Sequence, residues 1–388
     1  MTDDIEFEDE AEPEVEEDRF RRFSEAVLYS TDWTVETILS QLRRGNIQLN
    51  PNFQRRDAWN NSRKSLFIES IIVGLPIPQL VLAEIKDSRG QYIVLDGKQR
   101  LLSLLKFTAG EGDDQEGFAL SGLQARPDLA RIRYKRMEEE AELKGVLNAF
   151  LNYTIRTVII RNWPNRDFLY QVFLRLNTQS VKLSPQELRQ AIAPGPFTTF
   201  ADDFSADSMQ IQRLIGRTSP DPRMRDVEIL VRYLAFQNWL TDYRGRMKDF
   251  LDDTCARENY LWNERQERVR IQAEGFALAI DDLYTIFGER LARKPNSRSF
   301  NRALFDALSY YAAIPDVSAA MRANQEALTA AYDALFLEDE FKEAIESDTA
   351  GLPNTVSRVR RWGETLNEIC GLKLHLPHLA EGRITVDG

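Results

Sequence analysis

The sequence predicts an α+β fold in which a mixed α/β domain is followed by an all-α helical domain. Between residues 24 and 200, short β-rich segments alternate with amphipathic helical segments. From about residue 201, strand patterns disappear and apolar residues recur at helical spacing. The chain has 388 residues, enough for two folding units, and 43% of them are hydrophobic, so each unit can build a core.

Short β-rich and helical stretches define the elements expected in the first domain. Strands are predicted over residues 25–29, 47–49, 80–85, 92–95 and 153–161. Helices are predicted over 34–44, from 97 onward, over 168–176 and from 184 onward, and a further helix carries its apolar face at 68, 71, 72 and 75. A polar turn at 86–90 should join two of the strands as a hairpin.

Several residues mark helix ends in this domain. Gly45 and Gly74 each follow an amphipathic segment, as is common after helix C-termini. Ser184 and Glu187 have the three-residue spacing of a capping box, with Pro185 in the first turn between them. These signals support the predicted helix boundaries.

The second domain is predicted from repeated helical spacing alone. Apolar residues recur at every third or fourth position within residues 227–234, 276–287, 302–311, 326–337 and 356–370. The predicted boundaries are therefore residues 19–200 for the mixed domain and 201–388 for the helical domain.

Residues 1–18 form an acidic tail. Residues 3–18 hold eleven acidic and no basic side chains, so they account for the net charge of −11 and leave 50 acidic against 50 basic residues elsewhere. Such a segment repels itself and buries little, which predicts disorder. Two roles are open for it: a solubilising extension, or a mobile acidic competitor that covers a basic surface until nucleic acid displaces it.

Cysteine usage and the pattern of apolar residues indicate a cytoplasmic protein. Cys255 and Cys370 share no metal-ligand or redox spacing, which is typical of a reducing compartment. The acidic start is the reverse of a secretion signal, and the most apolar stretch, residues 66–85, is interrupted by acids and prolines. No membrane association is expected.

The first candidate site is the stretch in which a predicted strand ends in Asp96-Gly97-Lys98-Gln99-Arg100 and a helix begins. Free backbone N–H groups at a helix start attract anions, and glycine allows close approach of the backbone. Lys98 and Arg100 add positive charge in the first turn, where the helix dipole disfavours it, so a bound anion or an acidic partner is expected. The alternative is a helix that Asp96 caps, with two solvated bases.

Two further stretches carry polar side chains at notable positions. Gln54 and Arg55 lie in a polar loop between Phe53 and Trp59, where a guanidinium can contact phosphate and an amide can contact a base or sugar. Asn177 ends an apolar helical segment. Each stretch also has a purely structural interpretation, as a loop anchored by two aromatic side chains and as a left-handed helix cap.

Together these stretches resemble the N-terminal domain of GmrSD-type modification-dependent restriction endonucleases. The resemblance covers roughly residues 30–195 and rests on the order and spacing of several motifs. They are a Gln-Arg pair before Trp59, Gly-Leu-Pro-Ile-Pro at 74–78, a strand ending in Asp-Gly-x-Gln-Arg, Phe-x-Arg-x-Asn-Thr at 173–178 and Leu-Ser-x-x-Glu at 183–187.

The resemblance implies a ParB/sulfiredoxin-like α/β fold that binds and hydrolyses nucleoside triphosphates in bacterial anti-phage defence. It assigns catalytic roles to Asp96, Gln99 and Arg100, with Asp96 positioning Mg²⁺ or water. It assigns nucleotide and phosphate binding to Gln54, Arg55, Gly97, Lys98, Arg100 and Asn177. Gln99 and Asn177 would orient the nucleotide or the attacking water.

The chain departs from the family pattern in two places. Lys98 stands where the family commonly has glutamine, which keeps phosphate binding but leaves nucleotide preference and turnover open. Relatives often carry a C-terminal His-Asn-His nuclease domain, whose site needs a histidine base and metal ligands. The chain has only His375 and His378, so we expect this nuclease domain to be missing.

Four functions are compatible with the sequence. They are an NTPase or nucleotide sensor with a separately encoded effector nuclease, a DNA-binding module without turnover, a ParB-like nuclease that cuts DNA itself, and a scaffold that holds a partner through its helical half. The expected partners are a nucleoside triphosphate with Mg²⁺, DNA and the effector, and a homo-oligomer is open. Basic clusters at 131–136, 213–225 and 358–362 are either solvated faces or a track for a DNA backbone.

Overall fold

The structure, a computed structural model, describes residues 26–49, 59–86, 88–110, 117–165, 168, 169, 172, 175, 176 and 184–386. The chain divides into two compact units, and within the described residues the division falls between Ile192 and Ala193. The predicted acidic tail lies outside the described residues, as do residues 170, 171, 173 and 174 of the helix expected over 168–176 and three predicted site residues, Gln54, Arg55 and Asn177.

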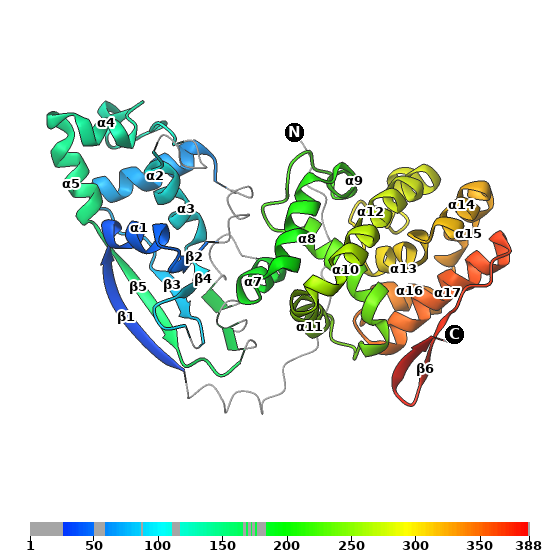
Figure 1. Cartoon of the computed structure of the whole chain (residues 1–388). Helices are drawn as coiled ribbons and strands as arrows, with labels where there is room; N and C mark the ends of the chain where they lie inside the picture. Colours follow the sequence, from blue (N-terminus) through cyan, green and yellow to red (C-terminus); the bar gives the residue numbers. More distant parts are fainter. Residues whose placement is uncertain are drawn as a thin grey trace. The chain divides into compact units, whose positions relative to one another are not determined.

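A five-stranded mixed sheet forms the centre of the first unit (Figure 1). Its strands are β1 (Val27–Thr34), β2 (Ile47–Gln48), β3 (Leu80–Glu84), β4 (Tyr92–Asp96) and β5 (Thr154–Arg161), in the order β1-β5-β3-β4-β2. β1 pairs with β5 and β3 with β4 in antiparallel fashion, whereas β3 with β5 and β2 with β4 are parallel. The expected strands are present, although β1 continues to Thr34 instead of ending at residue 29.

The central strand β3 is buried on both of its faces. Leu80 and Leu82 belong to one hydrophobic cluster and Val81 and Ala83 lie on the other side, and all four are at most 2% exposed. Successive side chains of a strand point to opposite faces, so a continuous buried run requires cover on both sides. The sheet is therefore the middle layer of the unit, which confirms the mixed α/β fold.

Helices supply this cover. The face of Leu80 carries α1 (Val35–Arg43), α2 (Asn61–Ile72), α3 (Lys98–Phe107) and α5 (Lys144–Asn152), as Figure 1 shows. On the opposite face, α7 (Pro185–Ile192) packs Leu188 against the sheet. Shorter elements complete the unit: α4 (Tyr134–Glu139) and the 3-10 turns Pro127–Leu129 and Ala141–Leu143.

The helix ends follow the sequence signals with one difference. The side chain of Thr34 caps α1 by accepting the N–H of Thr37 at 3.1 Å. α2 ends at Ile72, so Leu75, expected on its inner face, lies beyond the helix and is 51% exposed. The helix stops there because Gly74 adopts a φ of 77°, a left-handed conformation that ends a right-handed helix.

Glu69 of α2 anchors the loop that follows α3. Glu69 is 5% exposed, and its carboxylate accepts the backbone N–H groups of Gln124, Ala125 and Arg126 at distances from 2.7 to 3.1 Å. Successive N–H groups that converge in this way form a concave site for an anion. The carboxylate fills that site and holds residues 117–133 against the helical layer.

The second unit is built from helices around an apolar and aromatic core. They are α8 (Pro196–Asp207), α9 (Met209–Leu214), α10 (Arg225–Trp239), α11 (Met247–Tyr260), α12 (Trp262–Phe287), α13 (Arg302–Ala312), α14 (Pro315–Ala323), α15 (Gln325–Leu335), α16 (Asp339–Glu346) and α17 (Leu352–Cys370), with 3-10 turns at Leu240–Asp242 and Gly288–Arg290. A buried ion pair between Arg232 and Asp306, with 3.1 Å between Nε and Oδ1, ties α10 to α13. None of the described helices combines the length and apolar character needed to cross a membrane.

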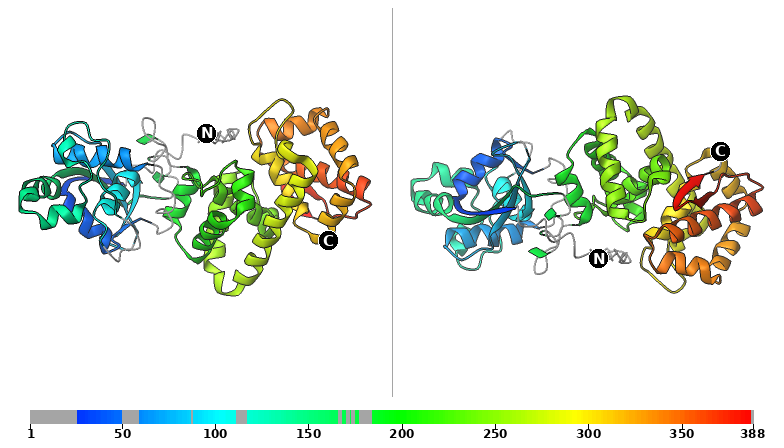
Figure 2. Two further views of the ribbon diagram at one scale, coloured as in Figure 1. Left: turned by 90° about the horizontal axis from the view of Figure 1, so that it is seen from above. Right: turned by 90° about the horizontal axis from the view of Figure 1, so that it is seen from below.

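The second unit is helical, as expected, and it ends in one strand hairpin that the sequence pattern does not predict. Strands β6 (Pro377–Ala380) and β7 (Arg383–Val386) form an antiparallel hairpin that packs on α17; Figure 2 shows it in red beside the orange helices. Glu381 and Gly382 have φ values of 51° and 72°, as a tight two-residue turn requires. Strands of four residues are too short to show a clear alternation of apolar residues, so the sequence pattern misses them.

Glu69→Ala is predicted to destabilise the first unit, because three backbone N–H groups lose a charged acceptor. Hydrogen bonds to charged groups contribute about 1.5–3 kcal/mol each at most, so the free energy of unfolding should fall by roughly 2–4 kcal/mol. Urea unfolding measures this change, and hydrogen exchange of residues 117–133 reports the loosened loop. Glu139→Ala, at an exposed position of α4, is the control, and equal stability of the two variants would contradict the anchoring role.

Candidate functional site

The candidate site lies where β4 ends and α3 begins. Gly97 alone makes the turn, with a φ of 101°. A methyl group at this position would lie 2.2 Å from Cδ2 of the buried Leu80, so the turn requires glycine. Among the described residues no side chain caps α3. The N–H groups in the first turn of a helix lack intrahelical partners and attract anions.

Arg100 is held by two acceptors at this turn. Its Nη2 lies 2.6 Å from Oδ2 of Asp96, and its Nη1 donates to the carbonyl oxygen of Pro78 at 2.6 Å. Arg100 is 7% exposed, whereas the side chain of Asp96 is 21% exposed. The guanidinium is therefore fixed in direction, while the carboxylate keeps part of its surface open to a ligand.

Lys98 forms a buried ion pair with Glu187. The distance from Nζ to Oε1 is 2.7 Å, and both side chains are 5% exposed. Lys98 opens α3 and Glu187 lies in the first turn of α7, so the pair connects two helices that pack on opposite faces of the sheet. The ion pair lies beside the C-terminal end of β4.

Glu187 also caps its own helix. Its Oε2 accepts the N–H of Ser184 at 2.7 Å, and the hydroxyl of Ser184 accepts the N–H of Glu187 at 3.1 Å. This is the capping box expected from the spacing of the two residues, and the prediction is confirmed. The carboxylate of Glu187 thus caps the start of α7 and also neutralises Lys98.

Two glutamines beside these ion pairs have polar atoms without a partner. Oε1 of Gln99 is buried, and no hydrogen bond to it occurs within the described part of the chain. The same holds for Nε2 of Gln186, a fully buried residue of α7. Buried polar atoms are nearly always hydrogen-bonded to protein or ordered water, so unmet amide groups at this place favour a ligand or a water molecule.

The alternative interpretation of residues 96–100, a helix that Asp96 caps with two solvated bases, is wrong in both of its parts. Gly97, not Asp96, occupies the cap position, and the two bases are buried in ion pairs instead of being solvated. Burying a cation is costly unless it is paired, so this arrangement is not that of an ordinary solvated helix start. The predicted site residues Asp96, Gly97, Lys98, Gln99 and Arg100 come together here, while Gln54, Arg55 and Asn177 lie outside the described residues.

The sequence does not reveal two contacts of this site. Glu187 reads as a capping acid and Pro78 as part of a turn, yet they are the partners of Lys98 and Arg100. Glu187 belongs to the Leu-Ser-x-x-Glu stretch and Pro78 to the Gly-Leu-Pro-Ile-Pro stretch. Their contacts show that these two stretches do more than mark the boundaries of helices. Their distance along the chain hides what they touch.

The basic cluster at 358–362 is internally neutralised. Arg358 is fully buried, Arg360 pairs with Glu364, and Arg361 pairs with Glu338. Guanidinium groups that already bind carboxylates have little charge left for a polyanion. This cluster therefore has little charge to offer a DNA backbone.

The two histidines lie near the C-terminal hairpin. In β6, the Nε2 of His378 lies 2.8 Å from the hydroxyl of Thr385 in β7. Within the part of the chain that the structure describes, no group of three or more His, Cys, Asp or Glu side chains is arranged to hold a metal ion.

Comparison with known proteins gives a family match within the first unit. Residues 35–193 match the family model described as the GmrSD restriction endonuclease, N-terminal domain. The matched segment begins with α1 and ends directly after α7, so it contains both ion pairs of the candidate site. No curated protein and no solved structure matches the chain. The match supports the N-terminal domain family for this segment.

Glu187→Gln is predicted to destabilise the first unit by about 3–5 kcal/mol, because the buried ammonium group of Lys98 would lose the carboxylate of its ion pair. The amide oxygen keeps an acceptor for Ser184, so the cap is largely preserved. The double variant Lys98→Met/Glu187→Gln lacks the buried ammonium group as well, so much of the lost free energy of unfolding should be recovered. Urea unfolding of the parent, the single variants and the double variant measures the coupling, and additive effects would rule out a direct pair.

Proposed function

We propose that this unit, which matches the N-terminal domain of GmrSD restriction endonucleases, binds and hydrolyses a nucleoside triphosphate in a restriction-type defence system. The observation that carries the proposal is the start of α3 after Gly97, where the Asp96–Arg100 and Glu187–Lys98 pairs bring two oriented cations to the first turn of a helix. Free helix N–H groups and oriented cations are the groups that bind polyphosphates in proteins.

The charge balance of the site supports a metal-bound nucleotide over a bare anion. Asp96 and Glu187 neutralise Arg100 and Lys98, so a phosphate has to compete with carboxylates for the two cations. The partly exposed carboxylate of Asp96 fits a Mg²⁺ ligand, and the bound ion would supply charge neutralisation for the phosphates. Hydrolysis should then require the nucleotide and Mg²⁺ together.

Each side chain has a defined part in this proposal. Lys98 and Arg100 hold the phosphates, and Gly97 lets the backbone approach them. Gln99 orients the nucleotide or the attacking water with its unmet amide oxygen. Gln54, Arg55 and Asn177 complete the binding of the nucleotide, as the resemblance to the family implies.

We further propose that the protein acts on DNA together with a separate effector nuclease. The proposal rests on the name of the matched family, a restriction endonuclease, and on the assignment of nucleotide chemistry to the site at Asp96. Binding of nucleotide would then regulate the effector, while the effector cuts the DNA.

Phosphate release from ATP, GTP, CTP and UTP with Mg²⁺, measured with and without DNA, tests the proposed activity. The parent should hydrolyse at least one of them, and Asp96→Asn should not, because the amide keeps the size of the side chain but lacks the charge that a metal needs. Asp32→Asn is the matched control, since Asp32 belongs to an exposed ion pair on β1. Turnover of Asp96→Asn at the parent rate would refute the role of Asp96.

Arg100→Ala is predicted to weaken nucleotide binding by about tenfold to a hundredfold, since a charge-assisted hydrogen bond contributes about 1.5–3 kcal/mol. Isothermal titration calorimetry measures the affinity, and urea unfolding checks that the buried side chain was removed without loss of the fold. Arg44→Ala, at an exposed arginine of the same unit, is the control. Arg100→Lys should lie between the two, and equal affinities of parent and Arg100→Ala would contradict phosphate binding here.

A further inference from the structure

β1 is an outer strand of the sheet in the first unit. Its partner on one side is β5, and within the described residues no segment pairs with its other edge. Figure 1 shows β1 in dark blue beside the green β5. The strand at the opposite end of the sheet, β2, has only two residues, whereas β1 has eight. β1 therefore offers a long row of backbone N–H and C=O groups to a further strand.

The sequence of β1 has few of the features that protect edge strands from pairing. It contains no lysine and no proline, and its ladder with β5 runs without a bulge. Its one charged residue, Asp32, already pairs with Arg156, with 3.3 Å between Oδ1 and Nε. Val27, Leu28 and Tyr29 are 50%, 67% and 50% exposed. An exposed apolar edge of this kind favours association with another strand.

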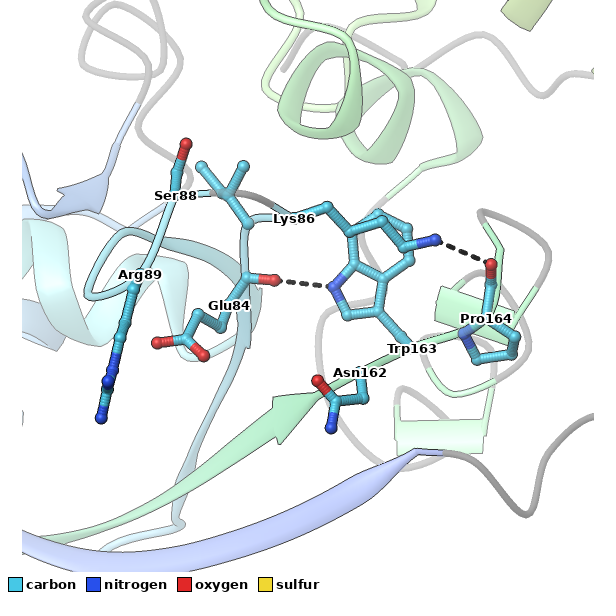
Figure 3. A pocket seen from close by; sticks show the side chains of 8 residues that line it. Glu84, Lys86, Ser88, Arg89, Asn162, Trp163 and Pro164 are labelled. Carbon is cyan, nitrogen blue, oxygen red and sulfur yellow. Dashed lines mark hydrogen bonds between the residues drawn. The ribbon is translucent and has the colours of Figure 1, made fainter.

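Side-chain contacts fix the end of the sheet beside β1. The guanidinium carbon of Arg161, in β5, lies 5.3 Å from the ring centroid of Tyr29, and its Nε lies 3.1 Å from Oε2 of Glu84. The indole N–H of Trp163 donates to the carbonyl oxygen of Glu84 at 2.7 Å, beside a cavity of about 540 Å³ whose lining Figure 3 shows. The exposed ring of Tyr29 is thus oriented already, so its ordering costs little when a partner binds.

Alternate residues of β1 direct their backbone groups to the open edge. The N–H of Val35 donates to the carbonyl oxygen of Tyr153 at 2.9 Å, one step beyond the last pair of the β1–β5 ladder. Directly opposite residues of an antiparallel ladder alternate between pairs that exchange hydrogen bonds and pairs that do not. The odd-numbered residues from 29 to 33 therefore bond β5, while Ser30 and Asp32 present both N–H and C=O at the open edge. Among the described residues no hydrogen bond reaches these groups.

We propose that β1 pairs with β1 of a second copy of this chain, antiparallel and about a two-fold axis beside Thr31. Ser30 of each copy then faces Asp32 of the other, and these two residues exchange both backbone hydrogen bonds. Tyr29 faces Trp33 of the second copy, and the two five-stranded sheets become continuous. The proposal goes beyond the proposed function, since it concerns assembly of the chain and not the site at Asp96.

The side chains of β1 select this register and favour a second copy as the partner. The hydroxyl of Ser30 is placed to donate to the carboxylate of Asp32 across the junction. Tyr29 and Trp33 form pairs without backbone bonds, where Cα atoms are only about 4.5 Å apart and aromatic side chains interact well. Centring the axis on Ser30 instead would place Leu28 against the carboxylate of Asp32. A strand from another protein would need to supply this pattern, whereas β1 matches itself.

Sedimentation velocity of the full chain, at concentrations of about 1–100 µM, tests the proposal. The parent should pass from monomer to dimer as the concentration rises. Ser30→Pro should weaken the dimer at least about tenfold, because each copy loses an N–H donor at the junction. Proline is tolerated on an edge where the N–H faces solvent, so the bonds to β5 remain, and urea unfolding checks the fold. Ser30→Ala keeps the N–H and, as the matched control, should dimerise within about threefold of the parent.

Cysteine cross-linking tests the register independently. In Thr31→Cys the two new thiols face each other with Cα atoms about 4.5 Å apart, within the range of a disulfide. Oxidised glutathione, which is reduced as the disulfide forms, should convert this variant to a covalent dimer on a non-reducing gel. In Ser30→Cys the two thiol-bearing residues are offset along the strands, with Cα atoms about 8 Å apart, so this variant should cross-link no more than the parent.

Three outcomes would overturn the proposal. They are a parent that stays monomeric over the whole concentration range, equal dimerisation of Ser30→Pro and Ser30→Ala, and equal cross-linking of Thr31→Cys and Ser30→Cys. The second outcome would place the contact between copies on a surface other than β1.

Discussion

The ion pair between Lys98 and Glu187 is the contact on which the arrangement of the first unit depends. It joins α3 and α7 across the end of β4, although the two helices pack on opposite faces of the sheet. A buried charge is tolerated only beside its partner, so the first turns of both helices must lie close enough for Nζ of Lys98 to reach Oε1 of Glu187, at 2.7 Å. Because Gly97 precedes Lys98 directly, the same contact sets the turn that ends the strand.

This constraint also shapes the chemistry of the candidate site. Lys98 and Arg100 stay oriented without a ligand because carboxylates hold them, and the carbonyl oxygen of Pro78 adds a second restraint on Arg100. Oriented groups need little reorganisation when a ligand arrives, which is the physical basis of preorganised sites. A phosphate that binds Lys98 and Arg100 draws these cations away from Glu187 and Asp96. The negative charge left on the two carboxylates then has to be neutralised, which favours a nucleotide that binds together with a metal ion.

The two ends of the sheet differ in the state of their charged groups. At the end of β4, buried acids and bases neutralise one another around Gly97. At the beginning of β4, the acid Glu84 is satisfied by Gly90 and Arg161, while Lys86 and Arg89 are exposed. A single hairpin thus connects a buried, balanced group of charges with exposed basic residues.

The sequence by itself determined the local features: the β3–β4 hairpin, the helix that starts after Gly97, and the capping box of Ser184 and Glu187. Each of these is encoded within a few residues, where spacing and turn chemistry decide the outcome. The hairpin of β6 and β7 escaped because its strands are too short to show a period. Only the tertiary structure decided that Lys98 meets Glu187 and that a cavity forms beside Trp163. These contacts join residues far apart in the sequence, and which of them meet depends on the order of the strands in the sheet and on the faces that the helices cover.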